Sequence, residues 1–217
     1  MRSLSRLLRE FNRLSICQLA DGLGPACVIE TELKPLHPEF RICGPAMTVL
    51  CSRGDNLTLH HALHLAKAGF VLVVSDGGNC NAALWGELMS LSAKQKGLKG
   101  TIVDGAARDL VEIRRIGYPV FSRAINPFNA AKEDYGSLNT PIRCGSLRVN
   151  PGDIMVADAN GIIAVPRAQV KLALAMGLKV LRRETGLKRR IKQGVTLFES
   201  LELEGRVRSR KAKRRDS

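Results

Sequence analysis

The sequence predicts an α/β fold: one layered β/β/α domain with a mixed sheet, helices on one side and a second β-layer on the other. Three observations predict it. Helical and strand-like segments alternate from residue 42 to 121, short strands with tight turns follow from 140 to 165, and a long helix opens at Arg167. At 217 residues the chain suffices for one well-packed domain and hardly for two. We expect a domain over residues 1–204 and a basic, disordered tail over 205–217.

The N-terminal third should contain two short helices, a strand, a helix and a buried strand. Ser15 can cap the second helix, and the dipeptides Asp21-Gly22 and Gly24-Pro25 should break the chain after it. Asp55 or Asn56 can cap the helix that precedes the buried strand. In order, the expected elements are helices Leu4–Leu14 and 15–20, strand Ile42–Leu50 interrupted at Gly44-Pro45, helix Leu57–Ala68 and strand Phe70–Val74.

The middle should continue the alternation and end in a compact β unit. The turn Asp76-Gly77-Gly78-Asn79 leads to a helix, and the turn Asp104-Gly105 leads to another that ends at Gly117. Asp158-Ala159-Asn160-Gly161 is typical of a hairpin turn. The expected elements are helix Ala82–Lys96, strand Thr101–Val103, helix Arg108–Ile116, strand Val120–Phe121, and strands Ile142–Arg143, Leu147–Val149, Ile154–Ala157 and Ile162–Val165.

Composition excludes several classes of protein. No apolar run approaches the roughly 18–20 residues that span a bilayer, and the N-terminus lacks the apolar segment of a signal peptide. Six scattered cysteines without a C-x-x-C pair indicate buried free thiols in a reducing compartment. We therefore expect a soluble, cytoplasmic protein without a membrane partner.

The net charge of +14 is concentrated at the C-terminus. Residues 179–217 contain 14 Lys or Arg and 5 Asp or Glu, a net of +9, so the other 178 residues carry only +5. Such a tail can attract nucleic acid or other anionic surfaces non-specifically, but it has no interleaved aromatic residues for base stacking. A solvated extension is the simpler interpretation. The charge therefore does not define the domain, and nucleic acid could bind only through the tail.

Polar groups gather where predicted strands end or helices begin. They are Asp76-Gly77-Gly78-Asn79, Gly86-Glu87 and Asp104-Gly105-Ala106-Ala107-Arg108-Asp109. In open α/β sheets ligands bind at the carboxyl ends of strands, and helix N-termini there offer free N–H groups to a carboxylate. Asp109 would supply an oxygen ligand for Mg²⁺ or Mn²⁺, Arg108 would bind a substrate carboxylate or stabilise an enolate, and Glu87 could hold a water or accept a proton. An Asp in the first turn of a helix can equally be only a cap.

An ordered set of motifs resembles the RraA-like / 4-hydroxy-4-methyl-2-oxoglutarate aldolase family over about residues 15 to 195. Single motifs such as Pro-Gly-Asp are weak evidence, whereas the ordered set is specific. The matching residues are Gly44-Pro45-Ala46-Met47-Thr48-Val49, Asp55-Asn56, Asp76-Gly77-Gly78, Ala83-Leu84-Trp85-Gly86-Glu87, Gly97, Gly100-Thr101-Ile102-Val103-Asp104-Gly105, Arg108-Asp109, Pro119-Val120-Phe121, Val149, Pro151-Gly152-Asp153, Asp158, Gly161 and Val165-Pro166.

The resemblance implies a swivelling-domain-like fold and a class II aldolase that also decarboxylates oxaloacetate. In such enzymes an acidic residue, twenty intervening residues and Arg-Asp form the site, which corresponds here to Glu87 and Arg108-Asp109. Asp109 would then bind the divalent cation (Mg²⁺ or Mn²⁺) directly and Glu87 through water, with Glu standing where many members have Asp.

The resemblance also implies the substrate contacts and the assembly. Arg108 would contact the pyruvyl part of a small 2-oxo acid, and backbone N–H groups of Gly86-Glu87-Leu88-Met89 would bind a carboxylate. Glu184 of a neighbouring subunit would complete the site in a homotrimer or a hexamer.

Other constellations carry less weight. His60 and His64 have i,i+4 spacing but lack the Glu of a zincin motif, which favours a half-exposed helix face over a metal site. Cys80 has no His nearby in the sequence, which favours packing. A different kind of function is a non-catalytic regulator that binds a ribonuclease or another RNA-associated protein, as a member of the same family does; such binding-only members tend to lack the acidic-x20-Arg-Asp set. Nothing resembles a site for S-adenosylmethionine.

Overall fold

The computed structural model describes residues 4–29 and 32–213 and confirms the predicted mixed α/β class. Its main sheet has the order β1-β6-β5-β3-β2-β10-β11, with β4 beside β5 and β7 beside β2. Strands β2, β3, β5 and β6 are parallel, whereas β1 and β10 pair antiparallel. The bounds are β1 Lys34–Pro35, β2 Ile42–Leu50, β3 Val71–Ser75, β4 Ala83–Trp85, β5 Gly100–Ala107, β6 Val120–Ile125, β7 Ser137–Leu138, β10 Ile154–Asp158 and β11 Gly161–Val165.

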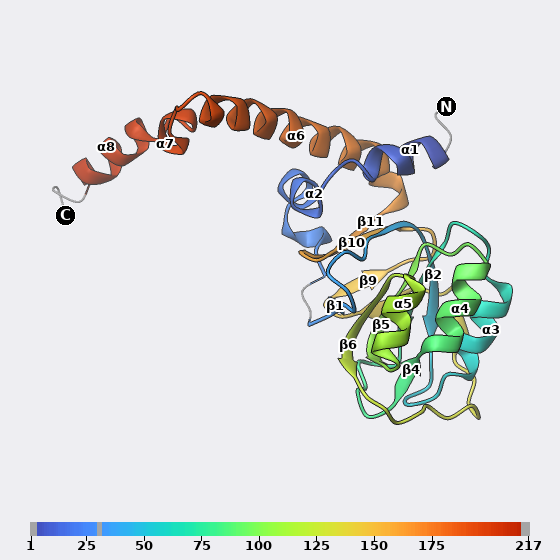
Figure 1. The fold of residues 1–217 in the computed structure, drawn as a ribbon. Coiled ribbons are helices and arrows are strands. Elements are labelled where there is room, and N and C mark those ends of the chain that lie inside the picture. The colour runs from blue at the N-terminus through green and yellow to red at the C-terminus, as the bar shows by residue number, and fades with distance from the viewer. Residues whose placement is uncertain (1–3, 30–31, 214–217) are drawn as a thin grey trace.

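Helices connect the parallel strands, as the alternating pattern predicts. Helices α3 (Leu57–Leu65), α4 (Glu87–Gln95) and α5 (Leu110–Ile116) lie together on one side of the sheet (Figure 1). The hairpin of β8 (Ile142–Cys144) and β9 (Leu147–Val149) contacts β2 and β3 on the other side. Every residue of β3 is buried, which a parallel strand covered on both faces requires. All connections therefore direct the carboxyl ends of β2, β3, β5 and β6 to one edge.

The N-terminal helices and the long C-terminal helix meet in a second apolar core. Helices α1 (Leu4–Phe11), α2 (Ile16–Leu23) and α6 (Val170–Lys192) pack over β10 and β11, with Phe11, Leu14, Leu19, Ile163 and Leu174 buried between them. Single 3₁₀ turns lie at Pro25–Cys27 and Arg167–Gln169. Beyond this core α6 leaves the domain and is followed by α7 (Leu197–Ser200) and α8 (Glu204–Lys213) (Figure 1).

Two predicted interruptions are wrong. Asp21-Gly22 does not break the chain, because Gly22 lies inside α2 where a side chain would meet Met176 of α6 at 3.0 Å. Strand β2 runs through Gly44-Pro45 without a break, since it hydrogen-bonds to β10 on one side before β3 joins on the other. A glycine is needed at Gly44 because a Cβ there would lie 2.7 Å from the Gly69 carbonyl oxygen. In both places glycine serves close packing rather than a turn.

The expected helix Ala82–Lys96 and turn Asp104-Gly105 are also wrong in part. Residues Ala83–Trp85 form β4 against β5, and α4 begins only at Glu87. Strand β5 continues through Asp104-Gly105 to Ala107, and α5 begins after Asp109. Pairing with β4 and β6 outweighs the local turn preference of Asp-Gly.

The predicted disordered tail begins as a helix. Residues Glu204–Lys213 form α8, which an i,i+4 ion pair between Glu204 and Arg208 supports. Residues 214–217 lie outside the described residues, and the domain boundary at residue 204 stays a prediction. None of the described helices is long and apolar enough to span a bilayer. All six cysteines are free thiols, as predicted, but only Cys43, Cys51 and Cys144 are buried, whereas Cys27 and Cys80 are half-buried and Cys17 is exposed.

Candidate functional site

A pocket of about 150 Å³ opens at the carboxyl edge of the parallel strands. It brings together every predicted site residue of α4 and α5, although they come from different connections of the sheet. A pocket of this size suits a small molecule. Its lining residues are Asn56, His60, Ala83, Leu84, Trp85, Gly86, Glu87, Leu88, Met89, Arg108, Asp109, Asn129 and Lys132.

Asp109 adopts a strained backbone conformation at the floor of this pocket. Its φ of 59° and ψ of 42° are left-handed, a conformation that costs a residue other than glycine roughly 1–3 kcal/mol and that clusters at functional sites. The side chain does not cap its own helix α5. Instead its Oδ2 accepts a hydrogen bond of 3.0 Å from the Glu87 N–H. Asp109 therefore does not cap α5, and the turn instead directs its carboxylate to the first N–H group of α4.

Gly86 permits this arrangement because it has no side chain. A Cβ at Gly86 would lie 2.6 Å from Asp109 Oδ2 and 3.3 Å from Arg108 Cγ. The start of α4 is further held by Ser90, whose hydroxyl accepts from Trp85 Nε1 at 2.7 Å and donates to the Gly86 carbonyl at 3.0 Å. The Trp85 ring in turn stacks on Tyr118. The first turn of α4, with the N–H groups of Leu88 and Met89, is thus rigidly placed beside Asp109.

Arg108 and Glu87 keep most of their hydrogen-bonding capacity. Arg108 Nε lies 3.5 Å from Asp109 Oδ2, and within residues 4–29 and 32–213 its guanidinium makes no other polar contact. Glu87 is half-buried, and its carboxylate has no partner in the same part of the chain. The Arg108 guanidinium and the carboxylates of Asp109 and Glu87 therefore share one small pocket. Their remaining donors and acceptors are available to a ligand.

A loop after β6 covers the pocket and is fastened by Asp55. The Asp55 carboxylate accepts from the N–H groups of Glu133 at 2.6 Å, Asp134 at 3.1 Å and Leu57 at 2.8 Å. Burial alone would raise the pKa of Asp55, but these three amides and the charge of Lys132 outweigh burial and hold that pKa below its ordinary value. Asp55 thus links the start of α3 to the loop that carries Asn129 and Lys132 into the pocket.

Two further pocket residues come from α3. Asn56 is buried, and its Nδ2 donates to the Leu84 carbonyl at 3.0 Å, while no described residue pairs with its Oδ1. A buried acceptor without a partner is costly, so a ligand or water donor is expected there. Partial burial, followed by the charge of Lys132, lowers the pKa of His60, which favours the neutral ring. The prediction that His60 lies only on a half-exposed helix face is therefore incomplete.

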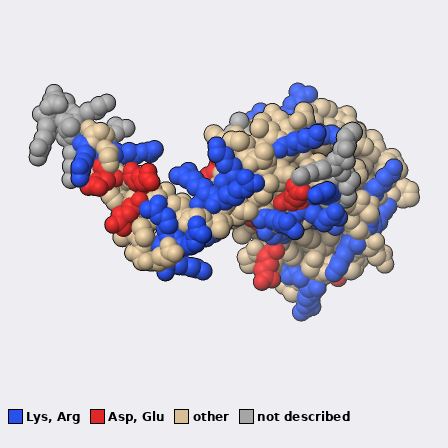
Figure 2. All heavy atoms as spheres, turned by 90° about the horizontal axis from the view of Figure 1, so that it is seen from above, with Lys and Arg blue, Asp and Glu red and all other residues tan. Residues whose placement is uncertain are grey.

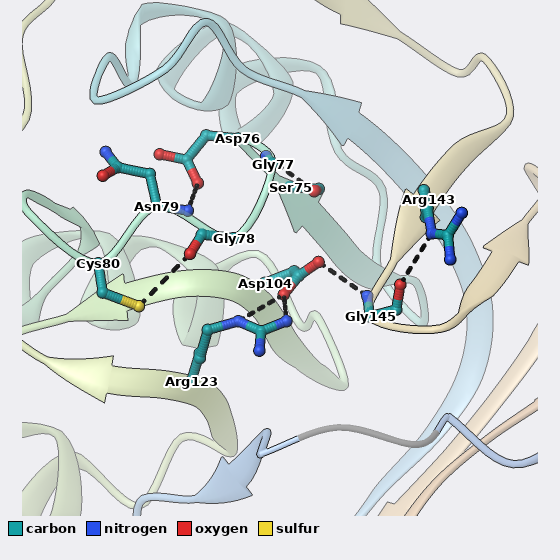
Figure 3. A network of polar contacts seen from close by, with 10 residues as sticks. All are labelled: Ser75, Asp76, Gly77, Gly78, Asn79, Cys80, Asp104, Arg123, Arg143 and Gly145. Carbon is teal, nitrogen blue, oxygen red and sulfur yellow. Dashed lines mark hydrogen bonds and ion pairs between the residues drawn. The ribbon is translucent and has the colours of Figure 1, made fainter.

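The other predicted strand-end carboxylates do not line the pocket. Asp104 pairs with Arg123 of β6 and accepts from the Gly145 N–H at 2.7 Å, while Asp76 accepts from the Asn79 N–H (Figure 3). Asp76 also accepts from the Gly54 N–H. Both side chains are buried. Burial raises the pKa of Asp76 despite its hydrogen bonds. Asp104 thus ties β5 to β6 and the β8–β9 turn, and Asp76 ties the loop after β3 to the loop after β2, which is a structural role.

Glu184 also lies outside the pocket of its own chain. Its Oε2 accepts from Gln18 Nε2 at 2.7 Å, because α6 packs on α2 at the end of the molecule away from β4 (Figure 1). Any contribution of Glu184 to a site therefore requires a second chain and stays a prediction. Of the other histidines, His61 bonds to the Tyr135 hydroxyl and His64 is exposed.

Asn56, Asn129 and Lys132 belong to the pocket but were not among the predicted site residues. A signal for the last two existed. They follow β6, the fourth parallel strand, and ligands bind at the carboxyl ends of such strands. The sequence predicts that this strand ends at Phe121, whereas β6 continues to Ile125, so the polar loop after it is not among the predicted strand ends.

The donor set fits a hard divalent cation that keeps several waters. No cluster of three or more His, Cys, Asp or Glu side chains occurs among the described residues, which argues against a zinc-type cage. Mg²⁺ requires only one or two carboxylates and retains water ligands. The Asp109 side chain is 35% exposed and directed into the pocket beside Glu87. The two carboxylates therefore suit such an ion.

The chain is similar in sequence to known proteins. A family model described as Aldolase/RraA matches residues 16–164. A protein of Halalkalibacterium halodurans, provisionally assigned as a 4-hydroxy-4-methyl-2-oxoglutarate aldolase, is 31% identical over 87% of this chain and 90% of its own.

Two solved structures share the fold. One is an uncharacterised protein from Pseudomonas syringae pv. tomato, with a TM-score of 0.85 and 26% identity over 93% of this chain and 95% of that one. The other is the RNA-processing inhibitor RraA from Thermus thermophilis, with a TM-score of 0.65 and 29% identity over 70% and 92%. Similar chains thus include both an assigned aldolase and an inhibitor.

Proposed function

The chain belongs to the Aldolase/RraA family, and from that premise we propose that it is a divalent-metal-dependent carbon–carbon lyase of small 2-oxo acids. Its reactions would be the cleavage of 4-hydroxy-4-methyl-2-oxoglutarate-type acids to pyruvate and the decarboxylation of oxaloacetate. One observation carries the proposal. Glu87, Arg108 and Asp109 line one pocket, where Arg108 and Asp109 pair with each other, the Glu87 carboxylate has no partner among the described residues, and Asp109 is held in a strained conformation.

Asp109 would hold the cation directly and Glu87 would hold it through a water molecule. The two residues differ in reach and in freedom, because Asp109 is already fixed by the Glu87 N–H whereas the Glu87 side chain is free to turn. When bound, the cation would act as a Lewis acid toward the 2-oxo group. Glu87 would retain the proton-accepting role that a half-buried carboxylate beside the substrate can fill.

Arg108 would bind the 1-carboxylate and the adjacent oxygen of the substrate. Its planar guanidinium can donate two parallel hydrogen bonds, and its position beside Asp109 places those donors over the pocket. The N–H groups of Leu88 and Met89 in the first turn of α4 would hold the second carboxylate oxygen. These contacts strengthen as negative charge develops on the 2-oxo oxygen, which is where stabilisation accelerates the reaction.

Both reactions release the same fragment. In the aldol cleavage the 4-hydroxyl proton passes to a base, the C3–C4 bond breaks and C4 becomes the carbonyl carbon of one pyruvate. The electron pair of that bond remains as the enolate of a second pyruvate, which then takes a proton at C3. In oxaloacetate the C3–C4 pair is released as CO₂ departs, and it leaves the same enolate beside Arg108.

The far side of the pocket indicates a substrate with a second acidic group. Lys132 adds a positive charge there, and its neighbour His60 is favoured in the neutral form. The unpaired Oδ1 of Asn56 requires a donor, which a substrate hydroxyl would supply. A hydroxylated 2-oxo dicarboxylate matches both features.

The complete site would include a second chain. Glu184 would reach a neighbour's pocket only in an oligomer, and we propose a homotrimer, or a hexamer made of two trimers. Sedimentation should therefore show no stable monomer at assay concentrations.

The direct test is a coupled assay of pyruvate release from 4-hydroxy-4-methyl-2-oxoglutarate and from oxaloacetate, with Mg²⁺ or Mn²⁺. We expect turnover of at least one substrate, its loss with EDTA, and its return when the cation is restored. Turnover that persists undiminished in EDTA would contradict the metal-dependent lyase.

The second candidate is a non-catalytic regulator, favoured by the likeness to the Thermus inhibitor. Such a protein would bind a ribonuclease or an RNA-associated protein without turning over 2-oxo acids. The assembled and unpaired Glu87, Arg108 and Asp109 groups argue for catalysis, since a binding surface does not require them. Absence of pyruvate release from both substrates, with a folded oligomer present, would favour the regulator.

A further inference from the structure

Helix α6 carries a face of positive charge that the proposed lyase does not use. Between Lys171 and Lys192 the helix has eight Lys or Arg residues and one acidic residue, Glu184. Six of the eight recur at helical spacing along one side of the helix. We call this set the basic stripe: Lys171, Lys179, Arg182, Arg183, Arg189 and Arg190.

The basic stripe points away from the domain. The residues of α6 that pack on the core are Val170, Ala173, Leu174 and Gly177, and they lie on the opposite side of the helix. The members of the stripe are exposed, except that Arg190 is half-buried where it approaches the Ser200 carbonyl. Figure 2 shows Lys and Arg side chains gathered where this arm leaves the domain, with the acidic side chains nearer its far end.

In the described part of the chain no acidic side chain forms a salt bridge with the basic stripe, although the Glu199 carboxylate of α7 interacts with the charge of Arg190 at its end. The salt bridges found there join Arg6 to Glu10, Arg108 to Asp109, Arg123 to Asp104 and Arg208 to Glu204. Glu184, the one acidic residue of α6, instead accepts from Gln18 on the side that faces α2. An ordinary solvated helix face mixes both signs of charge and gains from i,i+4 pairs, whereas this one holds like charges side by side.

The apolar face of the first half of α6 is already occupied, which favours one of two kinds of anionic partner. An amphipathic helix that binds a membrane inserts its apolar face among the lipids. From Val170 to Leu181 that face packs on α1 and α2, so only the charged face is available there, whereas Ile191 beyond it is exposed. A rigid row of six cations, about 29 Å long by the helix rise, fits a chain of phosphates. The scarcity of aromatic residues argues against base stacking and for contact with the backbone alone.

We propose that the basic stripe of α6 binds the phosphate backbone of nucleic acid without sequence specificity. The inference does not depend on lyase activity, because the stripe lies on the other side of α6 from Glu184 and shares no residue with the pocket. Binding releases condensed counterions and should therefore weaken steeply with salt. With six phosphate contacts on a single strand, the stripe should contribute about −4 to the slope of log K against log salt, in addition to any contribution of the basic residues after position 205.

The test measures fluorescence anisotropy of a labelled single-stranded RNA, about 30 nucleotides long and of mixed sequence, with the full chain between 50 and 200 mM salt. We expect saturable binding that weakens by about 10²-fold over this range and that is similar for a second, unrelated sequence. A stripe variant carries Lys179→Gln, Arg182→Gln, Arg183→Gln and Arg189→Gln. Because Gln has nearly the helix propensity of Lys and Arg, α6 should persist by circular dichroism.

A matched control separates the stripe from net charge. It carries Lys34→Gln, Lys67→Gln, Lys99→Gln and Arg115→Gln, four exposed residues elsewhere on the domain. The stripe variant should make the salt slope shallower by about 3, whereas the control should keep a slope near that of the wild type. Equal losses in both variants would overturn the proposal. So would binding to phosphatidylserine vesicles without binding to RNA, which would assign the stripe to a membrane surface.

Discussion

Two groups of acidic and basic side chains lie near the same edge of the sheet but differ in burial and in hydrogen bonding. Asp104 and Asp76 are buried and Arg123 is half-buried, and their bonds to side chains and backbone amides join β5, β6, the β8–β9 turn and the loops after β2 and β3. Asp109, Arg108 and Glu87 are half-exposed, poorly paired and supported by a strained backbone. The residue types are the same in both, carboxylates beside an arginine. What separates a structural carboxylate from a ligand-binding one is whether the fold satisfies its hydrogen bonds.

The largest expected effect is on catalysis, from Asp109→Asn. Asn tolerates the left-handed conformation as Asp does, so the unfolding free energy should stay within about 0.5 kcal/mol of the wild type. Loss of the carboxylate ligand should reduce kcat/KM for pyruvate release by about 10³-fold or more. Asp21→Asn, on the exposed side of α2, is the matched control and should keep full activity. Equal kcat/KM values for the two variants would contradict the assignment.

Asp104→Ala should reverse this pattern. It leaves the Arg123 guanidinium without its partner and the Gly145 N–H without an acceptor. Breaking such a pair costs about 3 kcal/mol, measured as a lower unfolding free energy in urea. Activity per folded molecule should change by less than about threefold. A large loss of kcat in the folded variant would place Asp104 in the site instead.

Gly86→Ala tests how close the two helix starts must be. The added Cβ would lie 2.6 Å from Asp109 Oδ2, so the carboxylate must move. A displacement of about 1 Å at a reacting centre lowers the rate roughly 10²-fold. The control, Gly186→Ala on α6, has open space around its Cβ and should be fully active. Wild-type activity in Gly86→Ala would show that Asp109 need not stay where it is.

Asp55→Asn should give the smallest effect, and it should depend on pH. The amide group of Asn cannot accept from all three backbone N–H groups, so we expect a loss of about 2 kcal/mol at pH 7. Because folding lowers the pKa of Asp55, its stabilisation is complete above the ordinary value of 3.8 and disappears as pH falls through the lower folded pKa. Urea unfolding at pH 7, 5 and 3 should show the difference between variant and wild type shrinking only at the acid end. A difference in unfolding free energy that stays constant from pH 7 to pH 3 would show that the ionised Asp55 carboxylate is not the source of the stabilisation.

The edge of the sheet that carries the pocket can be predicted because the relevant signals are local. Alternation of strands and helices locates the carboxyl edge, and the family resemblance singles out Glu87, Arg108 and Asp109 among its polar groups. The structure brings these three to one pocket, and their roles stay a prediction. Lys132 and Asn129 were not predicted because their loop is fastened by Asp55, a contact across 78 residues that no local pattern contains. The turn expected at Asp104-Gly105 is a strand for the same reason, since pairing with β6 outweighs local preference. Whether Asp104 is paired can only be known once β6 and the β8–β9 turn are in place.

The most direct test of the central claim is a titration of Mn²⁺ followed by the electron paramagnetic resonance signal of the free ion. We expect one bound Mn²⁺ per chain in the wild type and in Asp104→Asn, and at least tenfold weaker binding in Asp109→Asn. Because this readout needs no substrate, it does not depend on the identity of the 2-oxo acid. Equal Mn²⁺ affinity in the wild type and Asp109→Asn would show that the Asp109 carboxylate is not a metal ligand.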